Sequence, residues 1–411
     1  MNRPDSSQPP RECVRCLYRS SHPFGLQFDS EGLCTGCITH QEKFELDWNA
    51  RFLGLKELTT QQKRKNRYRH YDCVVPIRGT PEYFYVMEVV KNRLGLNPLA
   101  VSYNSQFNSE VGIQNLDRIR DTFDVDVLVY SSSAPIYKKL VRESLVRFSN
   151  MRWPYLAGES VFPVQVAVER DIPLIVWPYH QATEQVGMHS YKESPEMSRR
   201  NRAQFDLLGI EPEELNSSET LVRKNDVWDL LYPSDKDLVR TGLRGIYLSN
   251  YLPWDTRSYS EKMIREFGAI SARNPRTFDT YDRIDDMTYM SIHDVLKFYL
   301  HGYSRVTDNL SREIRFGRIT REDAVTLEKY YQSEYPKQNI QMFLDWLGMG
   351  YDSFVWYAER MPFFRHPPQK PNLEERHHIF IEGFNHDGRP VMDGGEFTIY
   401  GKGLKNTTKS H

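Results

Sequence analysis

The stretch Cys73-Val74-Val75-Pro76-Ile77-Arg78-Gly79-Thr80-Pro81 opens with a short apolar run and ends in a polar loop. An apolar run of this length, bounded by turn residues, is typical of a buried strand. Three more strands are predicted, with helical patterns between them: strands at 99–103, 125–130 and 172–177, and helices at 83–94, 111–123, 136–148 and 161–170. Strands that alternate with helices of this length predict βαβ units, so the expected fold class is α/β with a parallel sheet.

Four of the five cysteines precede this region in two paired units, Cys13-x2-Cys16 and Cys34-x2-Cys37. Each unit aims two thiolates at one point, and two units complete the tetrahedral ligand set of a structural zinc site. Unliganded cytosolic thiols are the alternative, but they leave the paired spacing unexplained. We therefore predict an N-terminal zinc knuckle, and we expect His22, in the loop between the two units, at the surface.

The organisation expected along the chain has five parts. They are a zinc knuckle (12–40), a helical linker (41–70), a PP-loop-like α/β domain (71–183), a mainly helical substrate and C-terminal domain (184–362) and a peripheral tail (363–411). In the linker, Phe44, Trp48 and Phe52 are spaced as one apolar stripe of a helix.

The composition argues against some classes of protein. Lysine and arginine (54) nearly balance aspartate and glutamate (55), for a net charge of −1, so a dedicated nucleic-acid binder is not expected. No run of about 18 apolar residues occurs, so no membrane span is expected. The first residues are polar and proline-rich, unlike a signal peptide. Together with the paired cysteines, these features predict a cytoplasmic protein.

Ligands of open parallel sheets bind beyond the carboxyl ends of the strands. The loop at residues 78–81 is therefore the first candidate, since a helix that begins there offers free N–H groups to a phosphate. Thr80 suits the N-cap of this helix and Pro81 its first position. Arg78 adds a guanidinium that can bind a phosphate through two N–H groups.

Several blocks of sequence carry a resemblance to one known family. They are the knuckle with Asp47-Trp48 and Arg51, the segments 71–75 and 94–99, Val111-Gly112 with Asn115-Leu116, Ile172-Pro173-Leu174-Ile175, and the block from Lys297-Phe298 through Gly302-Tyr303-Ser304-Arg305 to residues 311–324. Over roughly residues 12–360, the chain resembles the N-acetyl sugar amidotransferases of bacterial surface-polysaccharide synthesis.

The resemblance implies a PP-loop ATP pyrophosphatase fold, which is adenine nucleotide α-hydrolase-like. It implies that ATP and Mg²⁺ are used to convert an acetamido group of a nucleotide sugar to an acetamidino group, in lipopolysaccharide and O-antigen biosynthesis. The amide oxygen would attack the α-phosphate of ATP, and ammonia would then displace AMP from the imidoyl-adenylate. Glutaminase and cyclase-like partner subunits would supply the ammonia.

The chain departs from the resemblance at the phosphate loop, which reads SGGxDS in the family. Residues 78–83 keep only Gly79 and an acidic residue, Glu82. Tyr83 is bulky where a serine should touch phosphate, and Glu82 repels a phosphate unless Mg²⁺ lies between them. Either the triphosphate site is rebuilt around Arg78, or ATP hydrolysis is lost. Both alternatives remain open from the sequence.

The candidate site residues follow from the strand ends, the basic block and the resemblance. Glu82, His180, Glu184 and Lys297 are the predicted catalytic residues, and the predicted cofactor-binding residues are Arg78, Gly79, Thr80, Tyr103, Asn104, Arg305 and Arg315. His180 and Glu184 suit acid, base or sugar-hydroxyl contacts, unless they are loop residues without a role. The basic residues at 297–321 suit phosphate or carboxylate groups, unless they form surface salt bridges.

Two other functions remain open. A homologue that has lost ATP turnover would act as a sugar-binding or scaffold protein, and the altered loop favours this alternative. A tRNA thiolase of the PP-loop superfamily would also combine this fold with a zinc site. The balanced charge and the lack of a catalytic cysteine pair beyond the zinc site argue against a thiolase.

Overall fold

The computed structural model describes residues 10–65, 68–216 and 222–364, together with three short strands between 392 and 406. Its centre is a parallel sheet of five strands in the order β4-β2-β1-β5-β6. The strands are β1 (Cys73–Pro76), β2 (Pro98–Tyr103), β4 (Asp126–Tyr130), β5 (Leu174–Trp177) and β6 (Arg244–Tyr247). The predicted α/β class with a parallel sheet is confirmed.

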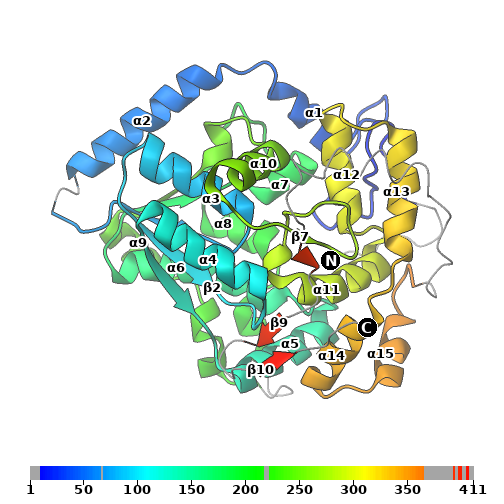
Figure 1. Ribbon diagram of the computed structural model, residues 1–411. Coiled ribbons are helices and arrows are strands. Elements are labelled where there is room, and N and C mark those ends of the chain that lie inside the picture. The colour runs from blue at the N-terminus through cyan, green and yellow to red at the C-terminus, as the bar shows by residue number, and fades with distance from the viewer. Residues whose placement is uncertain are drawn as a thin grey trace.

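Alternate side chains of the central strand enter two different hydrophobic cores. Val74 packs on one face of the sheet, whereas Cys73 and Val75 pack on the other. This arrangement follows from the two-residue period of a strand, and the burial of both faces explains the continuous apolar run. The first face is covered by α5 (Ala134–Phe148), α6 (Trp153–Glu169), α11 (Met287–His301) and α14 (Lys337–Leu347), and the second by α3 (Pro81–Met87), α4 (Glu110–Phe123), α10 (Thr256–Phe267), α12 (Arg305–Arg315) and α13 (Arg321–Ser333) (Figure 1).

The chain builds the sheet in two directions. It runs from β1 to β2 and β4, and then returns to the other side of β1 for β5 and β6. Val74 of β1 consequently pairs with Leu99 of β2 on one side and with Ile175 of β5 on the other. A crevice forms where the strand order reverses, between the carboxyl ends of β1 and β5. Open α/β sheets bind their ligands at this position.

The fifth strand, β6, lies in the part of the chain that we expected to be mainly helical. Its residues Arg244–Tyr247 pair in parallel with Leu174–Trp177 of β5. The run is short and begins with a charged residue, so its periodicity does not distinguish a strand from a loop. Only the pairing with β5, far away in the sequence, makes it a strand.

Further elements surround this core. They are α1 (Thr35–Glu42), α2 (Trp48–Lys65), η1 (Glu88–Arg93), β3 (Phe107–Ser109), α7 (Gln181–Val186), α8 (Arg199–Asn201), η2 (Arg202–Asp206), η3 (Pro212–Leu215), η4 (Lys224–Leu230), α9 (Asp235–Thr241), η5 (Leu248–Asn250), β7 (Ala272–Arg273), η6 (Ile284–Asp286), α15 (Tyr351–Ala358), β8 (Met392–Asp393), β9 (Phe397–Ile399) and β10 (Leu404–Asn406). Apart from residues 363–364 and the strands β8, β9 and β10, the tail expected at 363–411 lies outside the described residues.

The linker helix is interrupted. Because α1 ends at Glu42 and α2 begins at Trp48, Phe44 lies in the turn between them and is 69% exposed. The predicted apolar stripe of Phe44, Trp48 and Phe52 is therefore wrong. The helix α2 lies along the outer edge of the molecule (Figure 1).

The N-terminal knuckle packs against a helix that is distant in the sequence. The Leu17 N–H donates to Ser311 Oγ (3.3 Å), and the Tyr18 hydroxyl donates to Asp308 (2.9 Å). Both partners lie on α12, and Figure 1 shows the blue N-terminal segments beside α12 and α13. The knuckle is thus part of the folded body of the protein.

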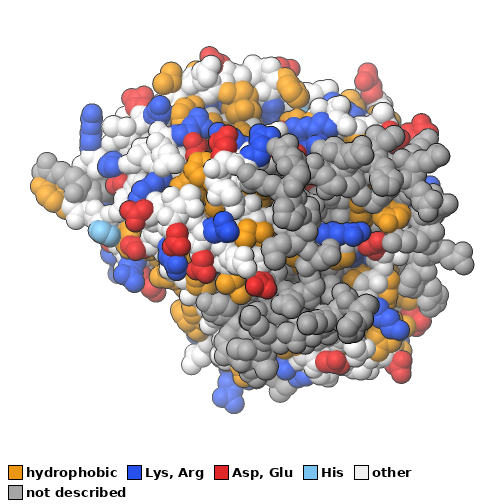
Figure 2. All heavy atoms as spheres, in the orientation of Figure 1, with side chains coloured by type: hydrophobic (Ala, Val, Ile, Leu, Met, Phe, Trp, Pro, Cys, Tyr) orange, Lys and Arg blue, Asp and Glu red, His pale blue; other side chains and the backbone are white. Residues whose placement is uncertain are grey.

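The surface carries both kinds of charge. On the face shown in Figure 2, acidic and basic side chains are interspersed, in keeping with the net charge of −1. Within the part of the chain that the structure describes, no helix combines the length and the apolar character needed to cross a bilayer.

Candidate functional site

A cavity of about 780 Å³ opens beyond the carboxyl ends of β1 and β5. Ile77 and Tyr83 line it next to β1, and Pro178 and His180 line it next to β5. It therefore occupies the crevice at which the strand order reverses, where open α/β sheets bind ligands. Its volume is typical of pockets that hold small molecules and cofactors.

The N-terminal knuckle forms one wall of this cavity through His22 and Phe24. His22 is only 4% exposed, so the expectation that it lies at the surface is wrong. Its ring stacks on Tyr303, with centroids 5.0 Å apart, and its Nδ1 accepts a hydrogen bond from the Phe24 N–H (3.2 Å). The knuckle loop is thus held against the cavity by its own side chains.

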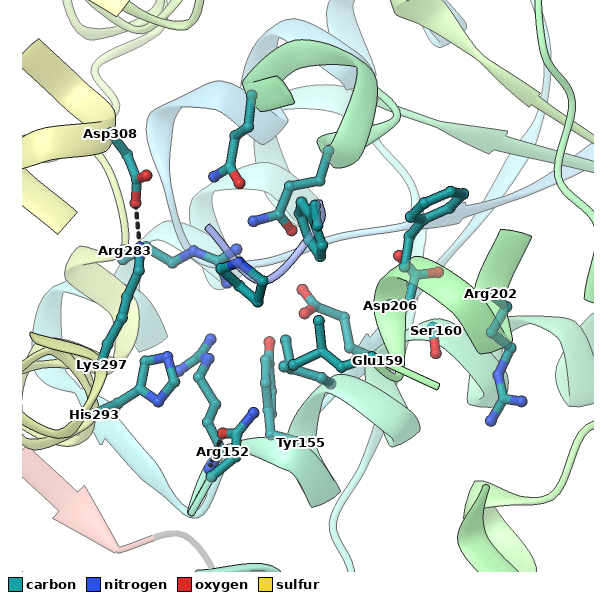
Figure 3. Close-up of a pocket in the computed structure, with 18 of the residues that line it drawn as sticks. Arg152, Tyr155, Glu159, Ser160, Arg202, Asp206, Arg283, His293, Lys297 and Asp308 are labelled. Carbon is teal, nitrogen blue, oxygen red and sulfur yellow. Dashed lines mark hydrogen bonds and ion pairs between the residues drawn. The ribbon is translucent and has the colours of Figure 1, made fainter. Parts of the chain in front are cut away.

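Basic side chains gather on one side of the cavity. Figure 3 shows Arg152, Arg283, His293 and Lys297 there, and we call this set the cationic side. Arg152 precedes α6, Arg283 precedes η6, and the other two residues belong to α11. Burial, with Arg152 and Lys297 as further causes, lowers the pKa of His293 well below its usual range. His293 is therefore a neutral imidazole between two cations.

The histidine and lysine residues that α11 contributes to the cavity are spaced four positions apart in the sequence. His293, Lys297 and His301 follow one another at intervals of four on α11, and all three line the cavity. The sequence analysis identified Lys297 and missed the two histidines, although this spacing could have revealed them. Lys297 Nζ pairs with Asp308 at 2.5 Å, which partly neutralises its charge.

Glu159 and Asp206 lie on the opposite side of the cavity, beside Ser160 and Arg202 (Figure 3), and we call Glu159 and Asp206 the carboxylate side. No hydrogen bond or ion pair joins the Asp206 carboxyl to the rest of the described chain. Burial, opposed by Arg202 and reinforced by Glu159, raises the pKa of Asp206 to about 7. A carboxyl group with this pKa can accept or donate a proton near neutral pH. The sequence analysis missed both residues, because neither belongs to a recognisable motif.

Residues 78–82, between Ile77 and Tyr83, do not line the cavity. An added Cβ at Gly79 would lie 2.0 Å from the carbonyl oxygen of Gly112, and one at Gly112 would lie 2.6 Å from the Cα of Asp285. The beginning of α4 therefore covers the loop. The predicted helix start is confirmed, since Thr80 is the N-cap of α3 and Pro81 follows it. The backbone at this start faces protein rather than the cavity.

Arg78 and Glu82, the two charged side chains of the loop, have partners within the protein. The Arg78 guanidinium contacts Asp285 twice at 2.9 Å. Glu82 accepts hydrogen bonds from Trp254 Nε1 (3.1 Å) and from Thr256 Oγ1 (2.8 Å), and burial raises its pKa to about 7. Arg78 Nη1 also lies 3.4 Å from Glu159 Oε1, so Arg78 contacts one carboxylate of the cavity wall from behind. Glu82 belongs to a buried network outside the wall.

Of the two candidates at the end of β2, Tyr103 lines the cavity and Asn104 does not. The Tyr103 hydroxyl donates to Asp229 (2.7 Å), so its ring is fixed in the wall. Asn104 donates to Ser131 Oγ (2.8 Å) and accepts from the Gln106 N–H (2.9 Å). Asn104 therefore shapes the loop that follows the strand.

The two candidates after β5 line the cavity, but both also have structural partners. His180 caps α7, since its Nδ1 accepts from the Thr183 N–H (3.3 Å), and burial lowers the pKa of His180 to about 4. Glu184 accepts from Lys43 Nζ (2.7 Å) and from the Tyr191 hydroxyl. These contacts hold α7 against the knuckle and leave less of either side chain for a ligand.

Arg305 and Arg315, at the two ends of α12, have different surroundings. Arg305 lines the cavity, whereas Arg315 Nη2 lies 3.7 Å from Cys34 Sγ and donates to the Gln185 carbonyl (2.8 Å). Arg315 therefore supports the knuckle. Among the predicted site residues, the cavity wall includes Tyr103, His180, Glu184, Lys297 and Arg305, and it does not include Arg78, Gly79, Thr80, Glu82, Asn104 or Arg315.

The four cysteines form a buried cluster with the geometry of a metal site. Their Sγ atoms all lie within 4.8 Å of one another, with Cys16 and Cys34 at 3.6 Å and Cys13 and Cys37 at 3.9 Å. A tetrahedron with Zn–S bonds of about 2.3 Å has S–S edges of about 3.8 Å, so the cluster fits a zinc ion. The nearby Arg315 guanidinium offsets the negative charge that four thiolates would bring.

Comparisons with known proteins place part of this chain in a biosynthetic context. The family described as LPS biosynthesis protein WbpG-like, C-terminal domain, matches residues 274–373, which contain Arg283, His293 and Lys297. An uncharacterized protein of Methanocaldococcus jannaschii is 18% identical over 136 residues, which cover 33% of this chain and 47% of that protein. The chain thus spans about half the length of this relative. The family match supports a role in lipopolysaccharide biosynthesis and suggests an enzyme.

Proposed function

We propose that the protein is an amidotransferase of surface-polysaccharide biosynthesis that converts an acetamido group of a nucleotide sugar to an acetamidino group. The observation that carries the proposal is the polarity of the cavity between β1 and β5. Its cationic side suits the diphosphate of a nucleotide sugar, and its carboxylate side suits a group that gains positive charge. The family match at residues 274–373 supports the polysaccharide context.

The carboxylate side suits the chemistry of this reaction. The acetamido oxygen leaves, ammonia supplies the new nitrogen, and the product amidine takes up a proton to become a cation. Two carboxyl groups, Glu159 and Asp206, face the cavity in which this charge would develop. Asp206, with a pKa of about 7, is able to accept the proton that the attacking ammonia loses.

Nucleotide phosphates would bind on the cationic side rather than at the loop after β1. When bound, ATP supplies the activation that makes the amide oxygen a leaving group, and this oxygen ends on AMP. The loop does not fit a triphosphate, because Gly112 covers Gly79 and Asp285 engages Arg78. The cavity offers space and guanidinium N–H groups that have no partner in the described part of the chain. Ammonia from glutaminase and cyclase-like partner subunits is part of the same proposal.

The test is a mass-spectrometric assay with UDP-linked acetamido sugars, ATP, Mg²⁺ and ammonium chloride, which replaces an ammonia-supplying partner. We expect a product in which one oxygen is replaced by an NH group, with one AMP and one pyrophosphate released for each product. Asp206→Asn should abolish the product and preserve binding of the nucleotide sugar. If the wild-type protein binds the sugars but never forms an amidine, the proposal is wrong.

A second candidate is a nucleotide-sugar-binding or scaffold protein without ATP turnover. The observation that favours it is the covered loop at Gly79. In the N-acetyl sugar amidotransferases that the sequence resembles, the corresponding loop is the phosphate loop. Calorimetry separates the two functions. Binding of a nucleotide sugar, with no heat from ATP and Mg²⁺ and no AMP in the assay, would support the second candidate.

A further inference from the structure

We propose that Arg283 and Arg152 form a preorganised site for the phosphate chain of a nucleotide, on the cationic side of the cavity. Only the identity of the ligand rests on the proposed function, which makes this ligand a nucleotide sugar. Its basis is the presence of two guanidinium groups with buried N–H donors for which the described residues provide no acceptor.

Arg283 is a cavity-lining residue. No hydrogen bond or ion pair joins its side chain to the rest of the described chain, and its Nη1 is buried. A buried N–H group without an acceptor costs free energy, so such groups are normally paired with protein, water or a ligand. A guanidinium charge in a partly enclosed cavity also costs free energy unless a group of opposite charge lies near it. Arg283 therefore has the surroundings of an anion-binding residue.

The backbone at Arg283 is held in an unfavourable conformation. Its φ is +54°, in the left-handed region that residues other than glycine seldom adopt. The residues around it resist relaxation: Asp282 pairs with Arg305, Asp285 with Arg78 and Asp286 with Arg152. Strain that is maintained by surrounding contacts is characteristic of functional positions. Here its consequence is that one guanidinium is directed into the cavity.

Arg152 supplies the second half of the site. It is 1% exposed, and its Nη1 contacts Asp286 at 2.5 Å, but its Nη2 has no hydrogen-bond partner among the residues that the structure describes. The Asp286 contact fixes the guanidinium plane, and Nη2 keeps an unused N–H donor in a residue of the cavity wall. Figure 3 shows Arg152 beside His293 and below Arg283 on the cationic side.

The chemistry of the site favours a phosphate chain over a single carboxylate. Asp286 compensates Arg152 and Asp308 compensates Lys297, so Arg283 carries the excess charge. The neutral imidazole of His293 adds a hydrogen-bonding group without adding repulsion between cations. A phosphate chain has more acceptor oxygens than a carboxylate and suits planar guanidinium donors. The source of the chain is either a nucleotide sugar or ATP.

The decisive variant is Arg283→Gly, because glycine adopts a φ of +54° freely. We expect an unchanged or higher melting temperature. We also expect calorimetric affinities for UDP-N-acetylglucosamine, UDP and inorganic pyrophosphate to fall by about 10- to 100-fold, as for the loss of charge-assisted hydrogen bonds. Arg152→Lys, which keeps the charge opposite Asp286, should weaken the same probes by a smaller factor.

Arg283→Gly both introduces a glycine and removes an arginine, and each of these changes has its own control variant. Asp124→Gly places glycine at an exposed position whose φ is also positive (+48°), and Arg240→Ala removes an exposed arginine of α9. Both should bind all probes as the wild type does. Calorimetry with ATP in the same series identifies the source of the phosphate chain.

The outcomes separate this site from the proposed reaction. Weaker binding of the UDP compounds in Arg283→Gly supports a nucleotide-sugar site, and weaker binding of ATP alone supports the same site with ATP as its ligand. Unchanged affinity for every probe, or a wild-type protein that binds none of them, overturns the site. A wild-type protein that binds UDP-sugar through Arg283 but forms no amidine leaves the site intact and removes the amidotransferase proposal.

Discussion

Arg78 and Asp285 form a two-point ion pair, with Nε–Oδ2 and Nη2–Oδ1 distances of 2.9 Å, although 207 positions separate them in the sequence. The pair joins the loop after β1 to the segment that carries Arg283. Arg78, which the sequence suggested as a phosphate ligand, thus fixes the backbone segment from which Arg283 reaches the cavity.

The first prediction concerns this ion pair. Arg78→Met should lower the free energy of unfolding by about 3–5 kcal/mol, because it leaves the Asp285 carboxylate buried without its partner. The double variant Arg78→Met with Asp285→Leu should recover part of this loss, since both charges are then absent. Urea unfolding of the single and double variants measures the coupling. Additive losses in the double variant would contradict the predicted pairing.

The second prediction concerns the covered loop. Gly79→Ala should destabilise the protein by about 1–3 kcal/mol or more, since the new Cβ would lie 2.0 Å from the Gly112 carbonyl oxygen. Gly54→Ala is the matched control, because no atom of the described residues lies within 4 Å of a Cβ at this exposed position of α2. The control should gain up to about 1 kcal/mol from helix propensity. Equal melting temperatures for the two variants would show that the loop at Gly79 is open.

The third prediction concerns the cysteine cluster. Cys34→Ser should release zinc and make the N-terminal segment sensitive to protease, because metal binding supplies folding energy to such small modules. It should also weaken UDP-sugar binding, since the knuckle supplies His22 and Phe24 to the cavity wall. Metal analysis, limited proteolysis and calorimetry measure the three effects.

Cys73→Ala is the control for the cysteine cluster. Cys73 is buried in β1, away from the cluster, so this variant should retain its zinc. A wild-type protein purified without zinc and unable to bind it would refute the metal assignment.

The fourth prediction concerns pH. A base must be ionised to accept a proton, so the rate of amidine formation should rise with pH through about 7, the pKa of Asp206. The folded-state pKa lies above the ordinary value of 3.8, so the Asp206 contribution to stability is fully present below about pH 4 and is lost as the pH rises through about 7.

Asp206→Asn should form no amidine at any pH, and it should remove the Asp206 contribution to the pH–stability profile. The exposed Asp235→Asn should change neither profile and serves as the control. A pH–stability profile that is the same in wild type and Asp206→Asn would show that the Asp206 carboxyl is not shifted in the folded protein.

The strands, the fold class and the cysteine cluster were predictable because their signals are local. The apolar run at residues 73–77 and the two CxxC units each fall within a few positions of sequence. The same reasoning missed β6, which becomes a strand only through its pairing with β5. It also assigned Phe44 to an apolar helix stripe, although the helix is interrupted at that position.

The site was only partly predictable. Tyr103, His180, Glu184, Lys297 and Arg305 line the cavity as strand ends and the basic block suggested, whereas Glu159, Asp206 and Arg283 belong to no motif. The sequence alone determined the parallel α/β layout and the metal-binding cysteines, because hydrophobic periodicity and ligand spacing act over short distances. Only the tertiary structure decided which arginine is paired and which is free. The carboxylates that neutralise Arg78 and Arg152 lie 207 and 134 positions away, and folding alone brings them together.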